Sequence, residues 1–327
     1  MLDTVLNKLR EVKESKIAII ESLIAKGLDI PLSTRLSDIA DIILNSNIGN
    51  LPEVNSTVVK YLDGTISSYN IENVISGDDS YDTPTNQIDN IQNVVELSIG
   101  NTITSIYDYT FYNCTNLSSI VIPNSVTFIG DYAFNNCNKL SSITIPNSVK
   151  LIGDNAFYRC SKLSSINFSN GLITIGANTF SQCTSLTSII LPDTVASIGD
   201  RAFIGCSNLV DITLPSSLTF ISQYLFSTCK SLTSINIPNN VTYIGGYSFY
   251  NCTNLSSITI PSSITSIGPY PFNLCSNLTS ITFDKTIDEV NALSNKYWGL
   301  PTGTQISCTD GILTTTTIVT SGGDGGN

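Results

Sequence analysis

The chain has 327 residues, with 15 Lys and Arg against 26 Asp and Glu, and a formal net charge of −11. This acidic balance argues against a nucleic-acid-binding protein, which needs a basic surface for the phosphates. The chain has no histidine, so catalytic triads that use an imidazole base are excluded. No phosphate-binding loop or dinucleotide fingerprint is present. We therefore predict no catalytic residue, no cofactor and no metal site.

Residues 1–50 are predicted to form a small α-helical module for attachment or oligomerisation. Apolar side chains recur at helical spacing over residues 2–26, and a second helix is expected over residues 36–44. A helical pair this small has little core of its own. It should pack on a copy of itself, on the rest of the chain or on a larger assembly, so homo-oligomerisation stays open. We assign this role to the apolar positions Leu2, Val5, Leu9, Val12, Ile17, Ile20 and Ile24.

The beginning of the chain mixes charged residues into the apolar pattern, so we expect no signal peptide. No apolar run reaches the roughly 18 residues that cross a bilayer, and we expect no membrane insertion. Residues 51–93 should link the helical module to the main domain and cap it. Within them, Asp63 and Gly64 stand between two alternating runs, which predicts a hairpin over residues 58–69.

Eight cysteines divide residues 94–277 into equal units. They stand 23 residues apart, each with a phenylalanine three residues before it and a leucine three residues after it. A fixed period of this length, rich in Leu and Ile, predicts a leucine-rich repeat solenoid of eight units. The repeated positions are Cys114, Cys137, Cys160, Cys183, Cys206, Cys229, Cys252 and Cys275; Phe111, Phe134, Phe157, Phe180, Phe203, Phe226, Phe249 and Phe272; and Leu117, Leu140, Leu163, Leu186, Leu209, Leu232, Leu255 and Leu278.

One unit, residues 117–138, illustrates the expected coil. Ile120 and Ile122 lie on one face of a first short strand, because side chains alternate across a strand. Val126 and Ile129 belong to a second short strand. Asp131 is predicted to cap a short helical turn that carries the repeated Phe and Cys inward. One coil buries too few apolar groups to offset its ordering entropy, so the fold should be a mainly β solenoid of stacked coils.

The regular period ends after residue 277, and residues 278–319 are predicted to cap the last coil. We expect a helix over residues 288–298 and a closing hairpin over residues 305–319 around Asp310 and Gly311. A cap is needed because the last coil would otherwise expose an apolar face. The glycine-rich residues 320–327 should be a disordered tail.

The repeat pattern L-x-x-I-x-I-P-x-S-V-T-x-I-G-x-x-A-F-x-x-C, over residues 94–300, resembles the BspA-type bacterial leucine-rich repeat family. Related repeats occur on bacterial surface proteins, in some protists and in phage-encoded proteins. The resemblance implies adhesion or recognition rather than catalysis. Separately, the strings K-G-L-D-I and S-D-I-A-D-I-I in the leader resemble N-terminal modules of phage virion proteins.

The cysteines and aspartates have alternative interpretations. The cysteines share their phase with buried Phe and Leu, so we interpret them as small buried hydrophobic residues; coil spacing alone does not exclude disulfides. A row of aspartates could cap helical turns or bind calcium through oxygen ligands, and we favour capping. This row is Asp108, Asp131, Asp154 and Asp200.

The first strands should expose neutral rows, one mainly serine and one of mixed Thr, Asn, Val and Ile. These rows fit a solvated sheet, a glycan-binding or protein-binding surface, or an ice-binding array. Tyrosines gather near both ends of the solenoid at positions that vary between coils, so the core does not require them. Tyrosine is enriched at binding surfaces, although these phenols could also merely cover the surface. The candidate ligand-binding residues are Tyr109, Tyr112, Tyr132, Tyr158, Tyr224, Tyr243, Tyr247, Tyr250 and Tyr270.

Together these features predict a non-enzymatic recognition protein whose solenoid binds a host-surface glycan or protein. The leader favours a phage virion component, such as a fibre or decoration protein. The alternatives are a bacterial cell-surface adhesin of the BspA type and a passive structural spacer. A glycosidase would need a carboxylate pair in a cleft, and nothing in the sequence marks one.

Overall fold

The structure is a computed structural model that describes residues 57–69, 73–75, 90–293 and 297–313. The predicted helical module over residues 1–50, with its seven assembly positions, lies outside the described residues. The same holds for the predicted tail over residues 320–327. No described helix is long and apolar enough to cross a bilayer.

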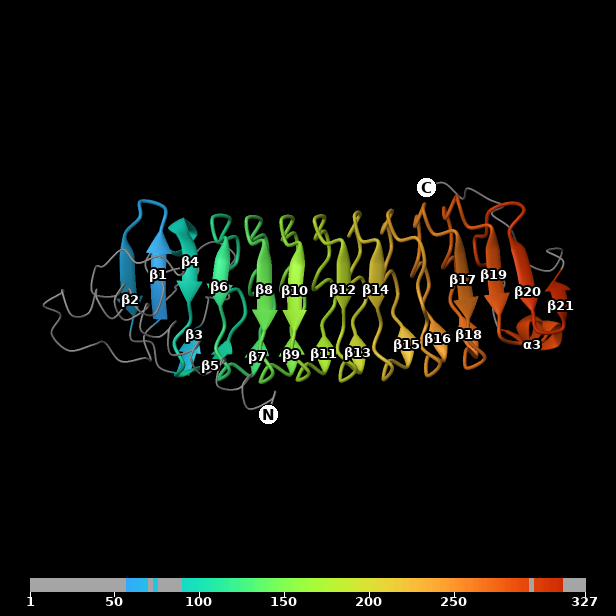
Figure 1. The fold of residues 1–327 in the computed structure, drawn as a ribbon, viewed down its shortest axis with the longest axis horizontal. Coiled ribbons are helices and arrows are strands. Elements are labelled where there is room, and N and C mark those ends of the chain that lie inside the picture. The colour runs from blue at the N-terminus through green and yellow to red at the C-terminus, as the bar shows by residue number, and fades with distance from the viewer. Residues whose placement is uncertain (1–56, 70–72, 76–89, 294–296, 314–327) are drawn as a thin grey trace, which may run out of the picture.

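The described chain winds into a solenoid whose coils lie side by side along its long axis (Figure 1). The coils contribute short strands to two rows, and one regular coil lacks the strand of the first row. The first row comprises β4 (Val94–Ser98), β6 (Ser119–Val121), β8 (Ser142–Ile145), β10 (Ser165–Phe168), β12 (Ser188–Ile190), β14 (Asp211–Thr213), β17 (Ser257–Ile260) and β19 (Ser280–Phe283). The second row comprises β3 (Asn73–Ile75), β5 (Ile103–Ile106), β7 (Phe128–Ile129), β9 (Leu151–Ile152), β11 (Thr174–Ile175), β13 (Ser197–Ile198), β15 (Phe220–Ile221), β16 (Tyr243–Ile244) and β18 (Ser266–Ile267).

The register between coils follows the 23-residue period. Ser142 pairs with Ser165 in a parallel ladder, and Thr174 pairs with Ser197 in the second row. In the coil without a first strand, a bridge between Asn236 and Thr259 keeps the same step. Because every coil has the same length, identical residues stack directly above one another. The predicted mainly β repeat solenoid is therefore confirmed.

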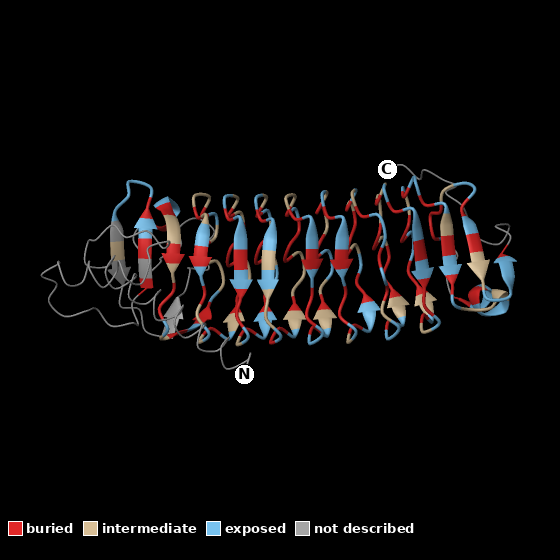
Figure 2. Cartoon of the chain, viewed as in Figure 1, coloured by how far each residue is buried: buried red, intermediate tan, exposed pale blue. Residues whose placement is uncertain are grey.

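The core runs through the middle of the coils and is built from the repeated positions (Figure 2). The eight repeated phenylalanines form a continuous stack, with neighbouring ring centroids 5.0 to 5.7 Å apart. The eight repeated cysteines and leucines are buried beside them. Each apolar group therefore packs against its counterparts in the adjacent coils, which is why a single coil is not a stable unit.

The segment predicted as a helical turn is a run of hydrogen-bonded turns and is not helical. In the coil of residues 117–138, Tyr132 has a φ of 55° and Asn136 a φ of 61°. Two left-handed residues four positions apart prevent a right-handed helix from forming. The other coils have left-handed residues at the same two positions. We call these segments, each between a second strand and the following first strand, the turn face of the solenoid.

An antiparallel hairpin covers the first coil. Its strands are β1 (Thr57–Tyr61) and β2 (Ile66–Tyr69), and β1 pairs with β4. The Asp63 carboxylate accepts hydrogen bonds from the backbone N–H and the hydroxyl of Thr65, which fixes the turn. A short 3-10 turn, Ile91–Asn93, leads into β4.

The other end is closed by α3 (Ile287–Ala292), β20 (Gln305–Cys308) and β21 (Gly311–Leu313). Thr286 and Glu289 form a reciprocal capping box at the start of α3. This helix is shorter than the predicted 288–298, because it ends at Ala292 and the chain then places Trp298 in the core. The ring centroids of Trp298 and Phe283 are 5.5 Å apart. The hairpin starts at Gln305 as predicted, and residues 314–319 of it lie outside the described residues.

Candidate recognition surface

The larger tyrosine group forms a ladder along the turn face. The Tyr224 and Tyr247 rings are stacked, with centroids 4.9 Å apart and planes 3° apart. The Tyr270 ring follows at 5.5 Å from Tyr247, and Tyr250 meets Tyr247 edge-on at 5.9 Å. The step between rings is close to the spacing of neighbouring strands, so the ladder follows directly from the 23-residue period.

Two residues that were not among the candidates extend this ladder. The Arg201 guanidinium lies 4.7 Å from the centre of the Tyr224 ring, and the Tyr297 ring lies 6.3 Å from Tyr270. Arg201 shares the repeat position of the tyrosines, so the sequence period alone could have placed it in the ladder. Tyr297 was missed because it follows Tyr270 by 27 residues, outside the regular period.

The smaller group forms a separate stack near the N-terminal end. The Tyr109 and Tyr132 rings are 4.8 Å apart and nearly parallel, and Tyr112 meets Tyr109 edge-on at 5.7 Å. Two candidates belong to neither stack. Tyr158 instead lies beneath the Arg159 guanidinium at 5.2 Å, and Tyr243 lies on β16 in the second row.

The ladder residues occupy strained backbone positions. From Tyr109 to Tyr270, this repeat position has φ between 52° and 59° in all eight coils. Asn155 and Asn178 stand there in the third and fourth coils, and asparagine tolerates this region better than tyrosine does. A tyrosine at this position costs about 1 kcal/mol or more of backbone strain. Stacking between rings returns about 0.5–1.5 kcal/mol per pair, so the gain in stability from tyrosine is small.

The stacked arrangement decides which atoms the ladder offers to a ligand. Ring faces inside the stack cover each other, so the edges and hydroxyl groups remain for contact. Partial burial, together with the neighbouring Tyr224, Tyr270 and Tyr250, raises the pKa of the Tyr247 phenol. This hydroxyl therefore keeps its proton at neutral pH and can donate a hydrogen bond.

The aspartates bridge neighbouring coils and do not cap helical turns, so that prediction is wrong. The Asp108 carboxylate accepts the backbone N–H of Asp131 at 2.7 Å, and Asp131 does the same for Asp154. Asp154 accepts from Ala177, and Asp200 accepts from Gln223. Burial and the two neighbouring carboxylates raise the pKa of Asp131. Among the described residues, no three His, Cys, Asp or Glu side chains form a group able to hold a metal ion.

The cysteine ladder is buried, and all nine cysteines are free thiols. From Cys137 onward, each repeated Sγ–H donates to the carbonyl oxygen of the phenylalanine 26 residues earlier. The Sγ–O distances are 2.9 to 3.3 Å. Burial raises the pKa of Cys114 and of Cys206 to about 12. These thiols are therefore protonated and structural.

The first-strand row presents a largely neutral face. Most of its outward side chains are exposed hydroxyls and amides, including Thr144, Asn167, Thr213 and Thr259, while Asp211 adds an exposed carboxylate. Ile190 interrupts the polar row and is 73% exposed. The mixture of apolar and polar groups gives this face no regular array of one side-chain type.

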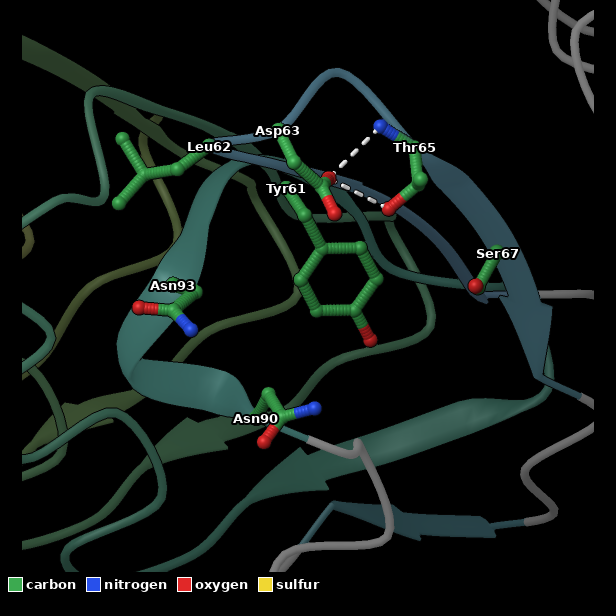
Figure 3. Close-up of a pocket in the computed structure, with 7 residues that line it drawn as sticks. All are labelled: Tyr61, Leu62, Asp63, Thr65, Ser67, Asn90 and Asn93. Atoms are coloured by element: carbon green, nitrogen blue, oxygen red, sulfur yellow. Dashed lines mark hydrogen bonds between the residues drawn. The ribbon is translucent and has the colours of Figure 1, made fainter.

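Two hollows lie at the ends of the solenoid, away from the tyrosine candidates. One of about 520 Å³ lies beside the first hairpin, and its walls include Tyr61, Asp63 and Asn90 (Figure 3). The other, of about 270 Å³, is lined by residues of the last coils, including Asn236 and Cys308.

Comparison with known proteins agrees with the repeat geometry. The family model described as "BspA type Leucine rich repeat region (6 copies)" matches residues 84–210 and 173–297. The chain belongs to the BspA-type leucine-rich repeat family. This BspA-type chain matches no curated protein.

Among solved structures, the BspA-type chain is similar to a leucine-rich repeat protein from Bacteroides ovatus. The identity is 25%, over 80% of this chain and 77% of that one, with a TM-score of 0.53. A leucine-rich repeat protein of T. pallidum is 28% identical, over 56% of this chain and 78% of that one, with a TM-score of 0.44. A leucine-rich cell surface protein from Faecalibacterium prausnitzii is 22% identical, over 76% of this chain and 98% of that one, with a TM-score of 0.34.

Proposed function

We propose that this BspA-type protein is a non-catalytic recognition protein at the bacterial cell surface, and that its turn face binds a glycan or a protein. Family membership supports this role, because repeats of this type occur on bacterial surface proteins. The rigid repeated core holds side chains of the turn face in fixed positions. Such preorganisation reduces the entropy lost on binding.

The tyrosine ladder is the observation that carries the proposal. Arg201 and the tyrosines occupy left-handed positions where Asn155 and Asn178 serve in other coils. Stability does not require tyrosine there, since strain and stacking nearly cancel. Tyrosine and arginine are the side chains most enriched at binding hot spots. Their position on a face where they are at least partly exposed therefore supports a role in contact with a partner.

The double variant Tyr224→Asn/Tyr247→Asn tests this role in the full chain. It gives two coils the residue that Asn155 already supplies. Binding to intact target cells and to arrayed glycans should weaken by about tenfold or more, as for loss of a hot spot. The control Phe220→Leu removes an exposed aromatic ring from β15, where Leu151 is the natural counterpart. Equal loss of binding in both variants would contradict a role specific to the ladder.

The virion role predicted from the leader rests on residues outside the described ranges and remains a prediction. Protease treatment of intact producing cells, compared with analysis of purified phage particles, separates the two locations. We expect cleavage on intact cells; its absence, with the protein present in virions, would favour the virion component. The passive spacer and the absence of enzymatic activity are likewise predictions. Unchanged binding after loss of the ladder would favour the spacer.

A further inference from the structure

The basic residues of the repeats are concentrated on the turn face. Residues 94–277 contain six Lys and Arg, and five of them lie in the turn segments. All five are exposed. They run from the coil of Tyr132, in the smaller tyrosine stack, to the coil of Tyr224, at the start of the larger one. We call Lys139, Arg159, Lys162, Arg201 and Lys230 the basic strip.

Within the described residues, no acidic side chain forms an ion pair with the basic strip. The one ion pair there joins Lys60 and Glu96, at the N-terminal end. The carboxylates of Asp131, Asp154 and Asp200, on the same segments, instead accept backbone N–H groups of the next coil. These segments therefore carry five cations against three aspartates, an excess of positive charge in a chain whose net charge is −11.

Aromatic rings restrain both arginines of the strip. The Arg159 guanidinium lies 5.2 Å from the centre of the Tyr158 ring, and Arg201 lies 4.7 Å from that of Tyr224. A guanidinium on a ring face retains its N–H donors for a second partner. Lys139 donates to the Asn116 amide oxygen at 2.9 Å and is also held near the surface. Cations fixed in this way lose little entropy when an anion binds.

The strip is long enough for a polymer. Lys139 and Lys230 are four coils apart, which corresponds to about 19 Å at strand spacing. Asn136 and Gln182 add amide groups along the same segments. Carboxylate or sulfate groups on an extended chain could therefore meet successive cations while hydroxyl groups meet the amides.

We infer that the basic strip binds an acidic polysaccharide along the turn face. This inference names the ligand class of the recognition role proposed above and rests on it. A protein partner fits less well, because Val210 is the single large exposed apolar side chain in the turn segments that carry the strip, and protein interfaces usually have an apolar core. Double-stranded DNA carries one charge per roughly 1.7 Å, and the acidic chain as a whole repels so dense an anion.

The test measures binding of the full chain to three immobilised polysaccharides: sulfated heparin, carboxylated hyaluronate and neutral dextran. The variant Arg159→Gln/Lys162→Ser gives one coil the residues of the next, Gln182 and Ser185, so the fold should be unaffected. A matched pair compares Lys162→Ser with Lys150→Thr, which removes a lysine outside the turn face at a position where Thr127 is the counterpart. A DNA duplex serves as a competing polyanion.

We expect binding to an acidic polysaccharide that weakens as salt rises, with little binding to dextran. The double variant should bind about tenfold more weakly, and Lys162→Ser should weaken binding more than Lys150→Thr. Equal affinity of the double variant and the unmodified chain would overturn the inference, as would equally strong binding of DNA. Tyrosine-dependent binding to a neutral glycan or a protein would overturn the inference and leave the recognition role standing.

Discussion

At the scale of single residues, the repeated cysteine contributes a hydrogen bond as well as apolar volume. The sequence identified it as a small buried residue from its phase with Phe and Leu. Its bond to a phenylalanine carbonyl of the preceding coil was not predictable, because that contact depends on how the coils stack. The phenylalanine carbonyl oxygen thus accepts two hydrogen bonds. That of Phe111, for example, accepts one from the backbone N–H of Cys114 and one from the thiol of Cys137.

The burial of these thiols predicts selective labelling by iodoacetamide. At pH 8 in the native protein, only Cys308 should react, because the eight repeated cysteines are buried. Burial and the nearby Asp310 also raise the pKa of Cys308, so its labelling should accelerate as pH increases. Mass spectrometry of intact protein before and after denaturation measures the number of labels. More than one label on the native protein would contradict the packing.

The raised thiol pKa values also predict loss of stability in alkali. Below the ordinary thiol pKa of about 9, both folded and unfolded chains keep the proton. Above it, the unfolded chain releases protons that the folded chain retains, so the free energy of unfolding falls by up to about 1.4 kcal/mol per pH unit per thiol. Urea unfolding between pH 7 and pH 10.5 measures this slope. Cys206→Ala should reduce it; an unchanged slope would exclude that thiol as a contributor.

Ser248 offers a test of an unsatisfied group. Its hydroxyl is buried and has no hydrogen-bond partner among the described residues. Alanine occupies the same repeat position in other coils, for example Ala133 and Ala156. Ser248→Ala should therefore raise the free energy of unfolding by about 1 kcal/mol. A lower thermal midpoint for this variant would mean that the hydroxyl has a stabilising partner.

At the scale of elements, the period predicted both strand rows, and the Asp63-Gly64 pair between alternating runs predicted the first hairpin. It did not predict that the third segment of each coil is a turn, because the left-handed residues that exclude a helix include tyrosine and arginine. Pattern reasoning expects glycine or asparagine at such positions. The aspartates were assigned a wrong role for the same reason. A helical turn was expected, so its N–H groups were taken as the partners of the carboxylates, whereas the carboxylates accept N–H groups of the next coil.

The repeated glycine at the end of the second strand allows close approach between coils. A Cβ on Gly176 would lie 2.5 Å from Oδ1 and 2.6 Å from the backbone nitrogen of Asp154. Gly176→Ala should destabilise the fold by about 1–3 kcal/mol. Ser222 fills the equivalent position in another coil, where its hydroxyl donates to the Ile198 carbonyl. Gly176→Ser should therefore be less harmful than Gly176→Ala; the reverse order in urea unfolding would contradict this account.

At the scale of the whole molecule, the structure is a rigid rod of stacked coils with a cap at each end. This much followed from the 23-residue period and from the broken repeat after residue 277. The site was only partly predictable: the sequence gathered the tyrosines into two groups and placed Arg201 in their row, but ring stacking and Tyr297 required the three-dimensional register. The basic strip was missed because its members, apart from Lys139 and Lys162, occupy different repeat positions.

Assembly through residues 1–50 remains a prediction at this scale. If the apolar positions form a helical interface, Leu9→Glu/Ile20→Glu in the full chain should lower its mass in light scattering to that of a monomer. Buried carboxylates would oppose any helix–helix contact. An unmodified chain that is already monomeric would mean that these positions do not drive self-association.

The measurement that tests the central claim most directly is the stability of Tyr224→Asn/Tyr247→Asn beside its binding. If the ladder serves recognition, relief of backbone strain should offset most of the lost stacking, and urea unfolding should show a loss of about 2 kcal/mol or less. Binding should nevertheless fall sharply. A core truncation, Phe226→Ala, should cost about 3–5 kcal/mol for comparison. A loss for the tyrosine variant as large as that of the core truncation, with binding unchanged, would show that the ladder is structural and would contradict the claim.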